Sequence, residues 1–189
     1  MNQSQSLGGL RVAILVAEGF EQVEMTEPRA AFEAAGAKTT IVSPERGDVV
    51  GFNHHDRGDA FPVDVALDAA DPKRFDALLL PGGVANPDAL RMLPTAVAFV
   101  RAFGDAGKPI AAICHASWTL IEAGLVAGKT MTSWPSLKTD LVNAGATWVD
   151  KSVVVDGTLV TSRKPDDIAD FNREAIAVFA NARAHAPAR

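Results

Sequence analysis

The sequence predicts an α/β fold: a doubly wound, mostly parallel sheet with helices on both faces. Two observations support this prediction. Short segments rich in Val, Ile and Leu alternate along the chain with longer segments whose apolar residues recur at helical spacing. The short segments are apolar at nearly every position, as in parallel strands covered on both sides. Such folds bind ligands beyond the carboxyl ends of the strands, so residues that follow a strand are candidates for a functional site.

The first part of the chain is predicted to form a strand, a helix and a second strand. The strands are residues 10–17 (LRVAILVA) and 39–43 (TTIVS), and the helix between them stops at Gly36. Residues 45–64 are rich in Gly, Asp and His and are predicted to form loops and short hairpin strands. The apolar side of the helix contains Met25, Pro28, Phe32 and Ala35.

The central part contains two further predicted strands. Residues 75–80 (FDALLL) end at a Pro-Gly-Gly turn, and residues 109–113 (PIAAI) run directly into Cys114. A helix between these strands ends near Gly107, and residues 115–123 have helical character. Cys114 is therefore predicted to lie at a strand-to-helix junction. The apolar face of the longer helix contains Leu90, Leu93, Val97 and Val100.

The last part is predicted to form a β-hairpin and a closing helix. Residues 152–155 and 158–161 flank Asp156-Gly157, a dipeptide typical of two-residue hairpin turns. The closing helix begins near Asp166 and has one apolar side. That side contains Ile168, Phe171, Ala175, Val178 and Phe179.

The composition is that of a single globular domain. With 189 residues, 48% of them hydrophobic, we expect one domain over residues 1–189 with its core at about 10–183. The net charge of −5 and the lack of Lys/Arg runs argue against nucleic acid or an anionic membrane as a partner. The N-terminal residues lack the layout of a signal peptide, and no apolar run is long enough to cross a bilayer. We therefore expect a cytoplasmic location.

The chain has one cysteine and four histidines, and their spacing matches no recognised zinc motif. A single cysteine cannot form an intramolecular disulfide, which fits a reducing compartment. Neither a phosphate-binding glycine loop nor a dinucleotide fingerprint is present, so we expect no metal and no cofactor. His54 and His55 lie in the loop-rich segment and are assigned no role.

Cys114 is the candidate nucleophile. The strand before it, the helix after it and its small Ala neighbours allow a sharp elbow that exposes the thiol at the edge of the sheet. The start of a helix and the imidazole of His115 both favour the thiolate. We therefore expect the pKa of the thiol to lie well below its unperturbed value of about 8.5. The alternatives are a buried structural cysteine and a histidine bonded to a local carbonyl group.

Two glycines and two acids follow other strands. The amides of Gly82 and Gly83 can point into the same cleft as the His115 amide and form an oxyanion hole, although a plain turn explains them equally well. Glu21 and Glu24 are three residues apart, so one helical turn places them on the same side. They are either solvated charges at a helix start or, beside a thiolate, a proton shuttle with a raised pKa.

Six segments, taken in their order and spacing, resemble the PfpI branch of the ThiJ/PfpI superfamily, also called intracellular protease I or general stress proteins. The likeness extends from residue 10 to about residue 180. The segments are AEGFEQVEM (17–25), LLLPGG (78–83), AAICHAS (111–117), TSWPSLKTDLVNAGATWVD (132–150), VVVDGTLVTSR (153–163) and PDDIADFNRE (165–174).

The resemblance implies a flavodoxin-like fold, similar to class I glutamine amidotransferases, with the cysteine on a nucleophile elbow. Cys114 matches the nucleophile and His115 the adjacent imidazole. Gly83 and the His115 amide match the oxyanion hole. Glu24 matches the carboxylate beside the thiol, and Glu21 matches a second acid of the site.

Asp88 matches an acid that a neighbouring subunit supplies in PfpI-type proteases, which implies a homo-oligomer. By local sequence alone it is an ordinary residue at a helix N-terminus. The chain departs from the family pattern in three places: Ala116-Ser117 replaces Gly-Pro, no tyrosine lies near Trp134, and the acid is the shorter Asp. A shorter carboxylate is less able to orient His115. Trp134 either walls a pocket or packs in the interior.

Two functions follow from these residues. The first, which we favour, is a stress-response cysteine hydrolase in which Cys114 attacks a carbonyl group of a peptide, a small carbonyl compound or a glycated protein. Glu24 is the better base for aldehyde chemistry, whereas acyl transfer needs His115 and Asp88. The alternative is a non-catalytic redox sensor or chaperone-like stress protein whose reactive cysteine is oxidised.

Overall fold

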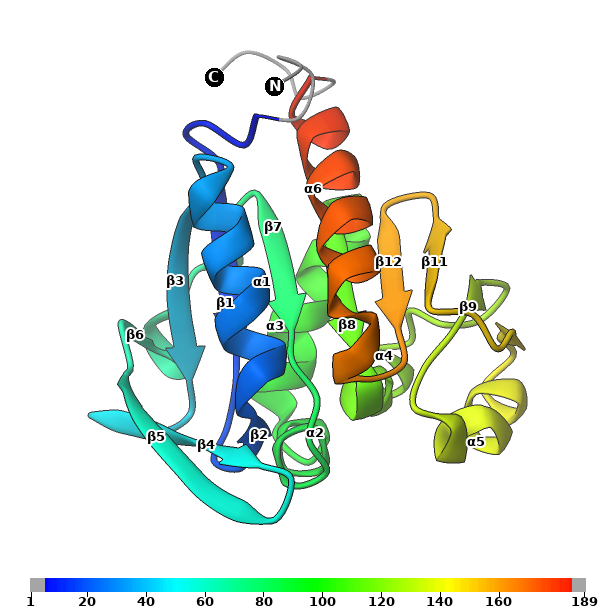
Figure 1. Ribbon diagram of the computed structural model, residues 1–189, viewed down its shortest axis with the longest axis horizontal. Helices are drawn as coiled ribbons and strands as arrows, with labels where there is room; N and C mark the ends of the chain where they lie inside the picture. The colour runs from blue at the N-terminus through cyan, green and yellow to red at the C-terminus, as the bar shows by residue number, and fades with distance from the viewer. Residues whose placement is uncertain (1–5, 185–189) are drawn as a thin grey trace.

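The structure is a computed structural model that describes residues 6–184. Its centre is a seven-stranded sheet in which the order of the strands across the sheet differs from their order in the chain (Figure 1). The strands, in chain order, are β1 (Arg11–Leu15), β3 (Lys38–Ser43), β6 (Val65–Ala66), β7 (Ala77–Leu80), β8 (Ile110–Ile113), β11 (Val153–Asp156) and β12 (Leu159–Ser162). Their order across the sheet is β11-β12-β8-β7-β1-β3-β6. All neighbouring pairs are parallel except β11 and β12, which form an antiparallel hairpin.

Helices cover both faces of this sheet. One face carries α1 (Gln22–Ala34) and α6 (Ile168–Ala184), and the other carries α3 (Pro94–Asp105) and α4 (Ser117–Glu122) (Figure 1). The carboxyl ends of β1, β7, β8 and β12 all meet at one edge of the sheet. Residues that follow different strands are therefore brought together at that edge.

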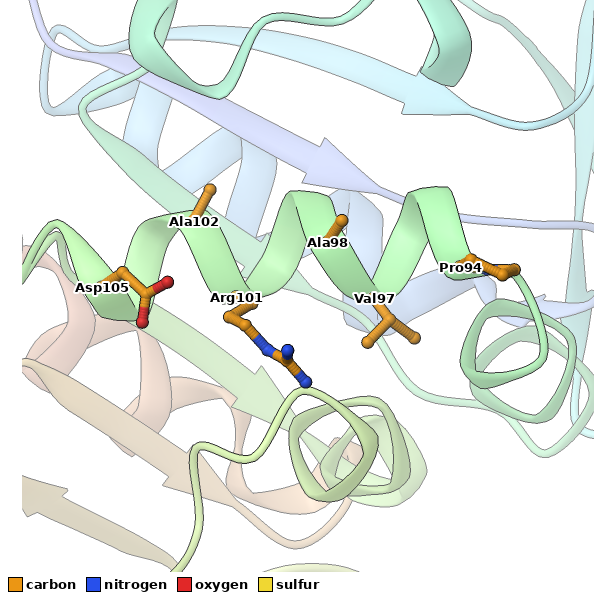
Figure 2. A pocket seen from close by; sticks show the side chains of 6 residues that line it. All are labelled: Pro94, Val97, Ala98, Arg101, Ala102 and Asp105. Atoms are coloured by element: carbon orange, nitrogen blue, oxygen red, sulfur yellow. The ribbon is translucent and has the colours of Figure 1, made fainter.

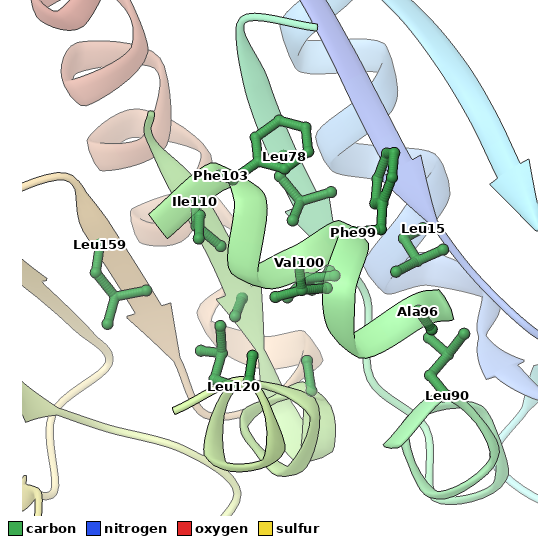
Figure 3. Close-up of a cluster of buried hydrophobic side chains, with 14 of the residues drawn as sticks. Leu15, Leu78, Leu90, Ala96, Phe99, Val100, Phe103, Ile110, Leu120 and Leu159 are labelled. Atoms are coloured by element: carbon green, nitrogen blue, oxygen red, sulfur yellow. The ribbon is translucent and has the colours of Figure 1, made fainter. Parts of the chain in front are cut away.

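Alternate side chains of each central strand enter two separate cores. Ile14 of β1 lies in the core under α1 and α6, which contains Phe32 and Phe171. Leu15, the next residue, lies in the core under α3 and α4 with Phe103 (Figure 3). Because both faces are covered, the strands are apolar at successive positions. The predicted fold class, a mostly parallel α/β sheet of the flavodoxin-like type, is confirmed.

Two predicted boundaries are wrong in detail. The helix expected before residue 107 is two helices, α2 (Ala85–Arg91) and α3. Leu93 between them is extended (φ −99°, ψ 111°), because a residue that precedes proline disfavours the helical region, and Pro94 then begins α3. In the C-terminal hairpin the turn residues are Gly157 and Thr158, one position later than predicted.

The loop-rich segment contains the expected hairpin. Its strands are β4 (Asp48–Asn53) and β5 (Asp56–Pro62), and β4 also pairs in parallel with the two-residue strand β2 (Phe20–Glu21). The N–H of Gly19 donates to the carbonyl oxygen of Val50 at 3.0 Å. This small sheet therefore lies beside the carboxyl end of β1, at the edge where ligands are expected (Figure 1).

A second small sheet follows α4, and the sequence did not predict it. It pairs β9 (Thr130–Met131) with β10 (Thr147–Trp148), and α5 (Lys138–Asn143) lies between them in the chain. Strands of two residues are too short to produce a periodic pattern. Within residues 6–184, no helix combines the length and apolarity needed to cross a membrane.

Candidate active site

Cys114 lies on a strand-to-helix elbow at the centre of the sheet. It follows β8 directly, and a 3-10 turn, η4 (Cys114–Ala116), leads from it into α4. Its φ of 64° lies in the left-handed region, which residues other than glycine adopt at an energetic cost. Among the non-glycine residues that the structure describes, only His54 shares this conformation. The elbow expected from the sequence is therefore present, but the prediction that it exposes the thiol is wrong, because Cys114 is buried in the single chain.

The glycine turn after β7 lies against this elbow. The backbone N–H groups of Gly83 and His115 act on the sulfur of Cys114 and lower the pKa of the thiol, so both favour a thiolate at this position. A Cβ atom added at Gly82 would lie 2.6 Å from both Cys114 Cβ and Glu24 Oε2. The absence of a side chain thus allows the backbone to approach the thiol closely. The glycine turn therefore lines the candidate site as well as connecting β7 to α2.

Glu24 places a carboxyl group beside the thiol. It lies in the first turn of α1 and is fully buried. Its Oε2 accepts a hydrogen bond from the Gly82 N–H at 2.9 Å, and its Oε1 has no hydrogen-bond partner among the described residues. Burial, with a smaller contribution from the charge of Glu21, raises the pKa of Glu24 to about 8. At neutral pH this carboxyl group is therefore protonated and able to donate a proton.

The raised pKa of Glu24 predicts a pH-dependent stability. A group whose pKa rises on folding contributes stability fully below its unfolded pKa, here near 4.5, and loses it as the pH rises through about 8. Relative to Glu24→Gln, the wild-type free energy of unfolding should therefore fall by up to about 1.4 kcal/mol per pH unit across that window. Urea unfolding of both proteins from mildly acidic to mildly alkaline pH measures the difference. A constant difference would show that Glu24 ionises normally.

The thiol of Cys114 is less acidic than the sequence predicts. Burial and the charge of Glu24 raise its pKa above the ordinary value, against the lowering effect of the His115 and Gly83 N–H groups. The prediction of a lowered pKa is wrong because it counted the helix start and the imidazole but neither burial nor the carboxylate. The carboxylate of Glu24 repels a thiolate at Cys114, and this repulsion is absent when Glu24 is protonated. The two groups therefore titrate as a coupled pair.

His115 is held between two indole rings. Its Nδ1 lies 3.1 Å from the Cys114 sulfur, and its ring stacks on Trp134 with the centroids 5.6 Å apart. On its other side the Trp118 ring is tilted, with a centroid distance of 5.2 Å. Burial lowers the pKa of His115, so the imidazole is neutral at neutral pH and can accept a proton. Trp134, 37% exposed, lines the site instead of packing in the interior.

Within one chain, Asp88 does not lie beside the other candidate site residues. It lies exposed on α2, and within residues 6–184 no hydrogen bond or ion pair joins it to His115. A single chain therefore assembles Cys114, His115 and Glu24 without the third member of the expected triad. An acid beside His115 would have to come from another chain.

His54, which the sequence left without a role, lies next to the site. Its backbone N–H donates to Glu21 Oε2 at 3.1 Å, and its Nδ1 lies 3.7 Å from the same oxygen. Glu21 is itself buried, and its charge acts on Glu24. A histidine in a loop carries no periodic signal. Only the nonlocal pairing of β4 with β2 brings it here.

A surface hollow elsewhere on the molecule carries no comparable chemistry. Figure 2 shows that it runs along the outer side of α3 and contains none of the site residues. In the part of the chain that the structure describes, no three His, Cys, Asp or Glu side chains are grouped so as to hold a metal ion. The hollow is lined by Pro94, Val97, Ala98, Arg101, Ala102 and Asp105.

The parallel sheet, the cysteine on its elbow and the buried carboxyl group beside it define a flavodoxin-like protein with a thiol-based site. Residues 10–178 match the model of the DJ-1/PfpI family, and the chain belongs to this family. The match includes every candidate site residue, from Glu21 to Trp134.

Relatives with curated names share most of the chain. "Deglycase PH1704" of Pyrococcus horikoshii is 42% identical over 165 residues, which cover 87% of this chain and 96% of the relative. "General stress protein 18" of Bacillus subtilis is 43% identical over 173 residues, which cover 90% of this chain and 98% of the relative. The crystal structure of Drosophila melanogaster DJ-1beta superimposes with a TM-score of 0.79 at 28% identity, covering 95% of this chain and 100% of that one.

Proposed function

We propose that this protein is a cysteine-dependent, stress-related hydrolase that acts on a small aldehyde or on the adduct of an aldehyde with a protein. The observation that carries the proposal is the buried carboxyl group of Glu24, protonated at neutral pH beside the Cys114 thiol. Such a group serves the addition of a thiol to an aldehyde directly. Peptide cleavage would instead need an acid that orients His115, which only a second copy of the chain could supply, whereas Glu24 is already in place within one chain. A relative named as a deglycase supports the same choice.

The proposed reaction begins with a bond between the sulfur of Cys114 and the aldehyde carbon. The carbonyl electrons move to the oxygen, which the N–H groups of Gly83 and His115 stabilise and to which the thiol proton passes through Glu24. For a 2-oxoaldehyde, Glu24 then removes the proton from the carbon bonded to sulfur and delivers it to the neighbouring carbonyl carbon, while the hydroxyl proton moves to the oxygen of that carbonyl group; a thioester of a 2-hydroxy acid results. Water cleaves the thioester and restores the thiol. The aldehyde carbon is oxidised and its neighbour reduced, so no external oxidant is needed.

Turnover of methylglyoxal tests this proposal. We expect saturable kinetics with the wild-type protein and no cleavage of fluorogenic peptides. Cleavage of peptides without turnover of methylglyoxal would show that the protein is a peptidase. If neither compound turns over while peroxide converts Cys114 to a stable sulfinate, detected by mass spectrometry, the redox-sensor alternative replaces both enzymatic functions.

We further propose that the chain forms a homo-oligomer through the surface that contains Asp88. The apolar side chains of Val84 (57% exposed) and Met92 (76% exposed) flank α2 on either side of Asp88 in the chain, and their burial against a second copy would be favourable. Light scattering is expected to give a dimer or a larger assembly, and Met92→Lys is expected to shift it toward the monomer. A wild-type monomer at all working concentrations would contradict this proposal.

A further inference from the structure

Asn86 forms hydrogen bonds with the backbone segments that follow two neighbouring strands, beside the candidate site. It is fully buried in the first turn of α2. Its Oδ1 accepts a hydrogen bond from the N–H of Ala17, which follows β1, at 2.7 Å. Its Nδ2 donates to the carbonyl oxygens of Pro81 at 2.9 Å and Gly82 at 3.0 Å, which follow β7. A flipped amide would set its oxygen against both carbonyl oxygens, so these partners fix its orientation.

The two carbonyl groups belong to the peptide units whose N–H groups face the reacting side chains. In a planar trans peptide, the C=O and the following N–H point in opposite directions. Because Asn86 holds the oxygen of Pro81, the Gly82 N–H points away from it and reaches Glu24 Oε2 at 2.9 Å. Because Asn86 also holds the oxygen of Gly82, the Gly83 N–H points away from it, on the side where it favours the thiolate of Cys114.

A turn made of two glycines needs such an anchor. Glycine has access to more backbone conformations than any other residue, so the peptide units of Gly82 and Gly83 have little intrinsic orientation. The N–H of Glu21 adds a longer bond of 3.3 Å to the oxygen of Gly82. Asn86 is the side chain that holds both units from one point.

We propose that Asn86 is a positioning residue that orients the Gly82 N–H toward Glu24 and the Gly83 N–H toward Cys114. This inference rests on the proposed function, because the orientation of these donors matters only if the thiol and the carboxyl group react. Without Asn86 the thiolate loses a well-placed donor, so its formation becomes less favourable.

Two variants of Asn86 test this role. Asn86→Asp keeps the shape and the acceptor for the Ala17 N–H but, when ionised, has no donor for the carbonyl groups. Asn86→Ala removes both functions and keeps the test informative if the first variant does not fold. In either variant, the rate of alkylation of Cys114 by iodoacetamide at neutral pH should fall about tenfold, the effect of roughly one pKa unit. The kcat for methylglyoxal should fall by a similar factor with little change in KM.

Asp76→Ala is the matched control. Asp76 Oδ2 accepts a hydrogen bond from the N–H of Arg11 at 2.9 Å and so links β1 and β7 at their amino ends, opposite to Asn86. Its loss should lower the free energy of unfolding and leave the alkylation rate unchanged. If wild type reacts and the Asn86 variants react as fast as Asp76→Ala, the positioning role is contradicted. If wild type itself neither alkylates nor turns over methylglyoxal, the proposed function has failed instead.

Discussion

Replacing Cys114 by serine is expected to abolish methylglyoxal turnover, and Glu24→Gln is expected to lower kcat by about a hundredfold or more. A serine hydroxyl is a far weaker nucleophile than a thiol, because it is much less acidic and forms far less of the reactive anion. The glutamine amide can imitate the hydrogen bonds of a protonated carboxyl group but cannot transfer a proton. Both effects are measured as kcat at saturating methylglyoxal, with circular dichroism to verify folding.

Asp88→Asn is the matched control for Glu24→Gln, because it neutralises a carboxylate outside the site that one chain assembles. Its kcat for methylglyoxal should equal that of wild type. The reverse pattern, a large loss in Asp88→Asn and a small one in Glu24→Gln, would assign the chemistry to an oriented His115. The aldehyde mechanism would then be wrong.

A single methyl group at position 82 is expected to remove activity and to destabilise the fold by about 1–3 kcal/mol. The Cβ atom of Gly82→Ala would lie 2.6 Å from Cys114 Cβ and from Glu24 Oε2, and 2.8 Å from the oxygen of Ile113. All three atoms belong to buried, well-held groups, so relief requires the site to open. The backbone of Gly82 is not in the left-handed region, so the effect is steric.

Gly157→Ala is the control for this prediction. Its φ of 62° is left-handed, but an added Cβ meets no atom within 4 Å. We expect a strain cost of about 1 kcal/mol and unchanged turnover. Chemical denaturation and methylglyoxal kinetics measure both quantities. An active, stable Gly82→Ala protein would show that the glycine turn and the thiol are not in close contact.

The sequence was sufficient to predict the fold class and the edge of the sheet at which the candidate site residues meet. Uniformly apolar strands indicated a sheet covered on both faces, and the residues that follow a strand in a parallel sheet meet at one edge. Cys114 follows β8 directly, Gly82 and Gly83 lie in the turn after β7, and Glu24 lies in the first turn of the first helix, so their proximity follows from topology. The break between α2 and α3 was also encoded, in Pro94, but the helical spacing of apolar residues on both sides concealed it.

Other features of the site depend on contacts that the sequence does not encode locally. His54 reaches Glu21 through the pairing of β4 with β2, and Asn86 acts through two carbonyl groups of the backbone. The acidity of Cys114 is the clearest case. Its immediate neighbours favour a thiolate, but burial and the charge of Glu24, which is 90 positions away, oppose it. The proton affinities of Cys114 and Glu24 therefore depend on each other and on their burial in the folded chain.

The pH dependence of Cys114 alkylation by iodoacetamide, compared between wild type and Glu24→Gln, tests the central claim that the thiol and the carboxyl group are electrostatically coupled. In wild type, Glu24 loses its proton near pH 8 and its charge then disfavours the thiolate, so the alkylation rate should rise only at a pH well above 8. In Glu24→Gln no carboxylate forms, so this rise should move to lower pH. Identical profiles in the two proteins would contradict the coupling of Glu24 with Cys114.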